Sequence, residues 1–223
     1  MKKLFAFLTA LTLLVGMTNA MAAATGKVKE VEFENSNEAR QRGAEIAIST
    51  CMLCHSFKYV KFKDLTAIGM SEEDIESLLD DQKIDDRMMS LTPIEVREES
   101  YGKVPPDLSM MTIARKKGPQ YVYTLLTDYY YREDGETDNH LFPGIKMPDA
   151  MAWADAESDA DRAEIEAQVS DLVAFLNWTA DPNADWRKTL GVYVIIYLVI
   201  ITALLYLLKK RIWRRVHAMY DEP

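Results

Sequence analysis

The chain has 223 residues, which is enough for one domain of moderate size with accessory segments but not for two large domains. Its net charge is −9, and residues 23–188 are more acidic still, with 19 Lys and Arg against 33 Asp and Glu and a formal charge of −14. This sign argues against nucleic acid as a partner and would attract a basic protein over long range. Acidity that serves only solubility is compatible with the same composition.

The N-terminal segment, residues 1–22, has the three parts of a secretory signal peptide. A pair of lysines follows Met1, an apolar run covers residues 4–17, and Ala20-Met21-Ala22 has the A-x-A form of a cleavage site. An N-terminal anchor helix is the alternative, but the apolar run is short for a bilayer that needs about 20 residues. We therefore expect the segment to export residues 23–188 as a domain.

Helical periodicity dominates that domain, and no convincing run of alternating strand residues appears. Two long segments without a predicted element, 87–111 and 135–152, need a source of order such as a cofactor. The spacing of apolar residues, together with serine and proline at the starts, predicts helices over 36–50, 71–79, 119–130 and 161–180.

A second apolar segment near the C-terminus predicts a membrane anchor over residues 189–208. Residues 190–208 carry no charge, and this uncharged run is about long enough to span a bilayer. Five Lys and Arg follow within residues 209–215. Since positive residues stay on the cytoplasmic side, residues 209–223 are expected in the cytoplasm and residues 23–188 in the periplasm, on a bacterial inner membrane. A buried core helix is the alternative.

The only two cysteines lie together in the pentapeptide Cys51-Met52-Leu53-Cys54-His55. C-x-x-C-H is the attachment pattern of c-type haem. The two thiols add to the two vinyl groups of the haem, and the histidine that follows ligates the iron. The sequence therefore predicts one covalently bound haem c, with His55 as the first axial ligand.

Three other kinds of site use a pair of cysteines, and each has a further requirement. A thioredoxin-like redox pair expects a βαβ pattern, which the sequence lacks. A zinc site needs four ligands, and there is no second cluster to complete it. A structural disulfide is compatible with export but leaves His55 without a role.

The residues alone leave several candidates for the second axial ligand. His217 follows the anchor and would lie on the wrong side of the membrane, whereas His140 and Met147 share the loop before the last helix of the domain. Methionine ligation raises the reduction potential and closes the iron to small molecules, which suits electron transfer. Met147 is the favoured candidate, with Met110, Met111 and Met151 as competitors and ordinary packing as the alternative.

In these motifs the chain resembles the cytochrome c1 family, the haem subunit of cytochrome bc1 (quinol:cytochrome c reductase) complexes. The matching motifs run in order through most of the chain: Arg42-Gly43, C-M-L-C-H-S over 51–56, P-P-D-L-S over 105–109, Ala114-Arg115, 121–127, Phe142-Pro143-Gly144 with Met147, 171–178, Asp181-Pro182, Arg187-Lys188, Leu190-Gly191 and the anchor.

The resemblance implies a mainly α, class I-type cytochrome c domain with long loops and one C-terminal transmembrane helix. It also implies site roles, which are haem attachment by Cys51 and Cys54, iron ligation by His55 and Met147, propionate binding by Arg115 and Tyr121, and lining of the pocket by Pro106 and Leu108. The family often has an Asn-rich stretch where residues 101–104 stand here, segment 58–99 matches little, and the short spacing from Gly144 to Met147 keeps Met151 in reserve.

The implied partners are cytochrome b and a Rieske iron–sulfur protein in the membrane, with a basic cytochrome c or a membrane cytochrome as electron acceptor. On this view the chain is a non-catalytic electron-transfer subunit. A stand-alone tethered shuttle that serves an oxidase or dehydrogenase would share the haem motif, and a peroxidase-like haem enzyme would need an open sixth position on the iron.

Overall fold

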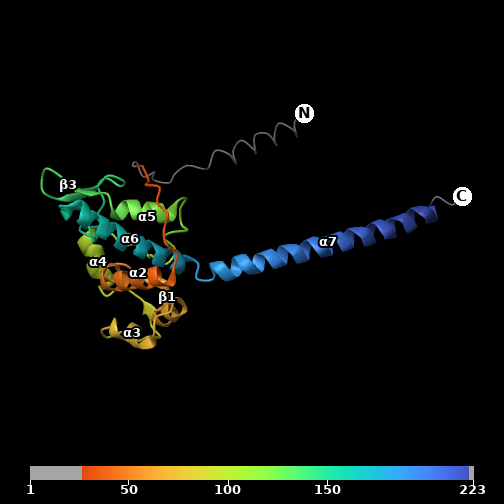
Figure 1. Cartoon of the computed structure of the whole chain (residues 1–223), viewed down its shortest axis with the longest axis horizontal. Helices are drawn as coiled ribbons and strands as arrows, with labels where there is room; N and C mark the ends of the chain where they lie inside the picture. Colours follow the sequence, from red (N-terminus) through yellow and green to blue (C-terminus); the bar gives the residue numbers. More distant parts are fainter. Residues whose placement is uncertain (1–26, 221–223) are drawn as a thin grey trace.

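The computed structural model describes residues 27–220 and is mainly helical (Figure 1). The predicted signal peptide, residues 1–22, lies outside the described residues. The α-helices are α2 (Asn37–Ser49), α3 (Glu72–Ser77), α4 (Ile94–Tyr101), α5 (Gly118–Leu126), α6 (Asp159–Ala180) and α7 (Ala184–Tyr220), and the 3-10 helices are η1 (Cys51–Leu53), η2 (Phe62–Ile68) and η3 (Trp153–Asp155).

Serine caps set the starts of three predicted helices. The hydroxyl groups of Ser36, Ser71 and Ser158 each accept the backbone N–H three residues on, at the starts of α2, α3 and α6. In α3 and α6 the carboxylate of the third helical residue, an aspartate, accepts from the backbone N–H of the serine, which completes a capping box. The four predicted helices are therefore present, with ends that shift by a few residues.

Helices α2 and α6 cross closely, and this crossing forms the centre of the core. A Cβ added at Gly43 would stand 2.1 Å from the backbone oxygen of Asp171, so only glycine fits there. Beside it, Arg42 makes a two-pronged ion pair with the Asp171 carboxylate, through Nε at 2.6 Å and Nη2 at 2.8 Å. Phe175 stacks between Phe57 and Trp178 and joins α6 to the strand that follows η1.

The structure adds two short antiparallel ladders that the sequence pattern did not predict. Strand β1 (Phe57–Lys61) pairs with β2 (Arg87–Met88), and β3 (Tyr129–Tyr131) pairs with β4 (Thr137–Asn139). They escape a search for alternation because β1 does not bury every second residue and the others are too short. The third helix consequently ends at Leu126, not Tyr130, since the three tyrosines form β3.

The long segment 87–111 contains a helix that was also not predicted. Helix α4 lies between Pro93 and Gly102, and Gly102 adopts a left-handed φ of +69° that ends the helix. Proline is common at the start of a helix and glycine just after its end, so the sequence does contain a signal for this helix. The first half of the loop expected to need a cofactor therefore has its own secondary structure.

Helix α7 leaves the body of the molecule as one long rod (Figure 1). Its segment Trp186–His217 contains a stretch of 18 residues with a mean hydropathy of 2.6, none of which is buried, and is long and apolar enough to cross a membrane. The predicted fold class, a mainly α domain with one C-terminal apolar helix, is confirmed. The helix is longer than the expected anchor 189–208, because Lys and Arg are good helix formers and continue it.

Candidate haem site

All the residues predicted to bind haem line one cavity of about 340 Å³, a usual size for a small-molecule site. Its walls are largely apolar and come from the segment after α2, from the end of α4, from α5 and α6, and from the loops before and after α5. The predicted residues brought together there are Cys51, Cys54, His55, Pro106, Leu108, Arg115, Tyr121 and Met147.

The imidazole of His55 is buried and oriented by the P-P-D-L-S segment. Its Nδ1 lies 2.7 Å from the carbonyl oxygen of Pro106. Since a carbonyl only accepts, Nδ1 must carry the proton, which leaves the lone pair of Nε2 available. Burial lowers the pKa of His55 and the charge of Arg97 adds to this, while the hydrogen bond to Pro106 and the charge of Asp107 oppose the shift only in part. The ring is therefore a neutral imidazole of the tautomer that can ligate a metal.

Both cysteines are free thiols that face the same cavity. Burial raises the pKa of Cys51 to about 12, so its sulfur is not a reactive thiolate. Among residues 27–220 no group of three or more His, Cys, Asp and Glu could hold a metal ion, and no disulfide joins Cys51 to Cys54.

The backbone of the Cys-x-x-Cys loop is braced by the segment 90–97, whose role was unassigned from the sequence. Three successive carbonyls accept hydrogen bonds from it: Met52 from the N–H of Leu91 at 2.9 Å, Leu53 from the hydroxyl of Ser90 at 3.1 Å, and Cys54 from Nη1 of Arg97 at 2.9 Å. The attachment loop is thus fixed by residues 37 to 43 positions away in sequence.

Three of the candidate sixth ligands line the same cavity as His55. Met147, Met151 and Met111 line the cavity, whereas Met110 does not and is 47 % exposed. His140 does not line it either and stacks on Tyr130, with ring centroids 4.0 Å apart. The geometry therefore removes Met110 and His140 from the candidates and leaves Met111, Met147 and Met151, of which the last two lie in the same loop.

Hydrogen bonds from the β3–β4 hairpin shape the loop of Met147. The hydroxyl of Tyr129 donates to the carbonyl of Met147 at 3.0 Å, and the carboxylate of Asp138 accepts from the N–H of Gly144 at 2.8 Å. The buried Asn139 side chain accepts from the N–H groups of Leu141 and Phe142. Sequence reasoning missed these residues, because the hairpin that positions them is too short to be read from periodicity.

Arg115 and Tyr121 form a pair at the cavity wall. The guanidinium carbon lies 4.1 Å from the centre of the Tyr121 ring. Among the described residues the buried Nε of Arg115 has no hydrogen-bond partner. A buried cationic donor without a partner is costly, so a carboxylate such as a haem propionate would satisfy it. The donor set and the apolar walls fit a haem.

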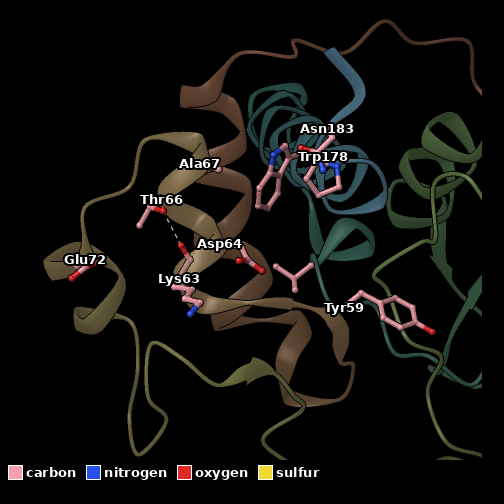
Figure 2. Close-up of a pocket in the computed structure, with 10 residues that line it drawn as sticks. Tyr59, Lys63, Asp64, Thr66, Ala67, Glu72, Trp178 and Asn183 are labelled. Atoms are coloured by element: carbon pink, nitrogen blue, oxygen red, sulfur yellow. Dashed lines mark hydrogen bonds between the residues drawn. The ribbon is translucent and has the colours of Figure 1, made fainter. Parts of the chain in front are cut away.

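A second cavity, of about 570 Å³, lies beside the start of α7 and shares no residue with the first (Figure 2). Lys63, Asp64 and Glu72 give it charge, and Trp178 forms one apolar wall. No cysteine, histidine or methionine lines it. Its larger volume does not make it the better candidate, because it lacks the groups that attach and ligate a haem.

Comparison with known sequences decides the family. The profile described as the Cytochrome C1 family matches residues 29–100 and 92–216. The chain belongs to the cytochrome c1 family. As a member it is a haem-carrying electron-transfer subunit of the cytochrome bc1 type, which confirms the resemblance seen in the motifs.

Individual relatives agree over most of the chain. Cytochrome c1 of Rhodospirillum rubrum is 32% identical over 79% of this chain and 81% of the relative. A protein of Nitrosomonas europaea named ammonia monooxygenase gamma subunit is 33% identical over 81% of this chain and 84% of the relative. Cytochrome b/c1 of Bradyrhizobium diazoefficiens is 29% identical over 80% of this chain but only 33% of that longer protein.

Proposed function

We propose that the chain carries one covalently bound haem c and passes single electrons through it within a cytochrome bc1 complex. The observation that carries this proposal is the cavity that gathers both thiols, an imidazole whose Nδ1 is held by a carbonyl, thioethers, and a guanidinium whose buried Nε has no hydrogen-bond partner among the described residues. A bound haem supplies a one-electron couple. The chain's own residues attach it, ligate it and keep water from it.

Each residue has a separate part in this proposal. Cys51 and Cys54 form the two thioether links, and His55 ligates through Nε2 while Pro106 holds Nδ1. Met147 is the sixth ligand, and its thioether closes the iron to small molecules. Arg115 and Tyr121 hold a propionate at the wall, and Pro106 and Leu108 pack on the ring.

The electron path follows from the proposed complex. Cytochrome b is the membrane neighbour, which the fused cytochrome b/c1 relative supports because the two functions share one chain there. A Rieske iron–sulfur protein delivers electrons, and a basic cytochrome c or a membrane cytochrome receives them. If the acidic surface of residues 23–188 docks the acceptor, electron transfer slows as salt rises, since screening weakens the attraction.

The proposed topology places the haem domain in the periplasm of a bacterium. Residues 1–22 act as the export signal, α7 anchors the chain in the inner membrane, and the basic residues after 208 stay in the cytoplasm. The apolar exposed surface of α7 is compatible with lipid on every side or with lipid and a neighbouring helix.

The experiment is a mild-detergent purification through a tag placed after Pro223, with identification of every protein that co-purifies. Cytochrome b and a Rieske protein in equal amounts are the expected result. Purification of this chain alone, with haem attached, would contradict the bc1 assignment and favour a tethered shuttle to an oxidase or dehydrogenase.

A further inference from the structure

The residue that this inference concerns is Arg97, on helix α4. Its side chain is almost fully buried, with 8 % of its surface exposed. Nη1 donates to the carbonyl of Cys54 at 2.9 Å, and Nε has no hydrogen-bond partner among the described residues. No carboxylate of residues 27–220 lies within ion-pair distance of it.

A buried guanidinium with this little compensation is costly for the fold. Burial removes its hydration, and a single neutral carbonyl replaces only part of it. The acidic residues of the same helix, Glu95, Glu98 and Glu99, are exposed, so water screens their charges. Near His55 the charge of Arg97 is opposed by that of Asp107, which is half-buried and whose carboxylate accepts from the backbone N–H groups of Lys58 and Ser109. The positive charge of Arg97 is therefore only partly compensated where it acts on the attachment loop, at Cys54, the residue before His55.

The sign of that action on a haem iron is fixed. Oxidation from the ferrous to the ferric state adds one positive charge at the iron. A fixed positive charge in a poorly screened position repels the added charge, so it disfavours the oxidised state and raises the reduction potential.

We propose that Arg97 is a positioning residue that pins the haem-attachment loop through the Cys54 carbonyl and raises the reduction potential of the haem by its buried charge. This inference rests on the proposed haem site. Helix α4 then acts as a clamp, because Tyr101, one turn further on, brings its hydroxyl to 3.4 Å from the sulfur of Cys54. The clamp holds Cys54 by its carbonyl and by its sulfur.

Two substitutions separate the charge from the geometry of the guanidinium group. Arg97→Gln removes both the charge and the planar fork, whereas Arg97→Lys keeps the charge and loses only the fork. Arg132→Gln is the matched control. Arg132 is exposed and forms an ion pair with Asp134 at 2.8 Å, in a different segment of the chain from Arg97.

The first measurement is an equilibrium redox titration of the full-length protein in detergent. Arg97→Gln should lower the equilibrium constant for one-electron reduction at least about tenfold, which corresponds to about 59 mV. The equilibrium constants of Arg97→Lys and Arg132→Gln should stay within about twofold of that of the parent. The first variant keeps the charge, and the second loses a charge that solvent screens. A parent-like potential in Arg97→Gln, or a Lys variant that falls as far as Gln, would overturn the electrostatic role.

The second measurement is hydrogen exchange of the Leu91 amide, which bonds the carbonyl of Met52 in the braced loop. Both Arg97 variants should exchange it about tenfold faster, because each loosens the clamp. Unchanged exchange in both would overturn the positioning role. If Arg97→Gln does not accumulate, Arg97→Lys still tests the proposal. A tenfold fall of its equilibrium constant for reduction would contradict the role of the charge, because this variant keeps the charge.

The parent protein separates this inference from the haem proposal. A parent without covalently bound haem refutes the proposed function itself. A parent with haem whose potential is insensitive to Arg97→Gln refutes only the role of Arg97.

Discussion

The two walls of the cavity are held in different ways. On the His55 side, the ring and the backbone of the attachment loop bond to segments 37 to 51 residues away in sequence. On the Met147 side, the bonds that shape the loop come from the hairpin just before it, at separations of 2 to 18 residues. Met147 itself is only half-buried, whereas His55 is buried.

Because of this difference, substitutions in the two walls should have different effects on the protein. The His55 wall is part of the core, so a change there is felt by the whole domain. The Met147 wall is a local unit held by a few bonds, so a change there should alter the iron environment while the fold stays intact. Four predictions test the comparison.

The largest effect is expected at the crossing of α2 and α6, which supports the His55 wall. Gly43→Ala places a methyl group 2.1 Å from the backbone oxygen of Asp171, so the helices must move apart. The free energy of unfolding should fall by about 3 kcal/mol, the upper range for overpacking. Denaturant titration followed by circular dichroism measures it.

Gly191→Ala on α7 is the control, because a Cβ there meets nothing within 4 Å. Equal stability of Gly43→Ala and the control would mean that the two helices are not in close contact.

The next effect concerns the ligand on the Met147 wall. Met147→Leu keeps the volume but removes the sulfur, so the reduced protein should bind carbon monoxide and its equilibrium constant for reduction should fall at least about tenfold, or 1.4 kcal/mol. Met151→Leu is the matched control and should leave both properties unchanged. The opposite pattern would move the ligand to Met151, and carbon monoxide binding by the parent would favour a haem enzyme.

A smaller effect is expected from the hydrogen bond that holds the Met147 backbone. Tyr129→Phe removes only the hydroxyl that donates to the Met147 carbonyl, which costs about 1 kcal/mol of local stability. Carbon monoxide should bind the reduced variant faster than the parent, because the loop opens more often. Tyr131→Phe on the same strand loses a bond to Asp155 at the surface and serves as the control. Identical binding rates in the two variants would deny Tyr129 this role.

The smallest effect concerns Lys29, which fastens the N-terminal segment to the Met147 side. Its Nζ donates to the carbonyl of Thr127 at 2.8 Å and lies 4.8 Å from the centre of the Trp153 ring. Burial lowers the pKa of Lys29 below its usual 10.5, and the carboxylates of Asp128 and Glu166 oppose this only in part.

The sign of the pH dependence follows from that shift. Between the lowered pKa and 10.5 the unfolded chain binds more protons than the folded one, so stability rises with pH in this window. Lys29→Met should abolish this contribution, which is below about 1 kcal/mol, and Lys27→Met, at an exposed position, should not. Denaturant titrations between pH 8 and about 10.5 measure the slope. A slope in the parent no more positive than that in Lys29→Met would contradict the assignment.

Local sequence determined much of this protein. The serine caps, the apolar spacing and Pro119 predicted four helices, and the uncharged run over 190–208 predicted the apolar helix α7. The pentapeptide over 51–55 and the P-P-D-L-S and F-P-G motifs pointed to the cytochrome c1 family, which the family match confirms. These features are readable because caps, helical spacing and attachment motifs depend on residues within a few positions of one another.

Only the tertiary structure decided what surrounds the attachment loop. Nothing in the pattern of segment 58–99 distinguishes Arg97 from a solvent-exposed arginine of an acidic helix, yet chain closure over 43 residues buries it against Cys54. The same holds for Tyr129 and Asn139, whose hairpin is too short to show a period. Long-range hydrogen bonds depend on how distant segments pack, which a one-dimensional pattern does not contain.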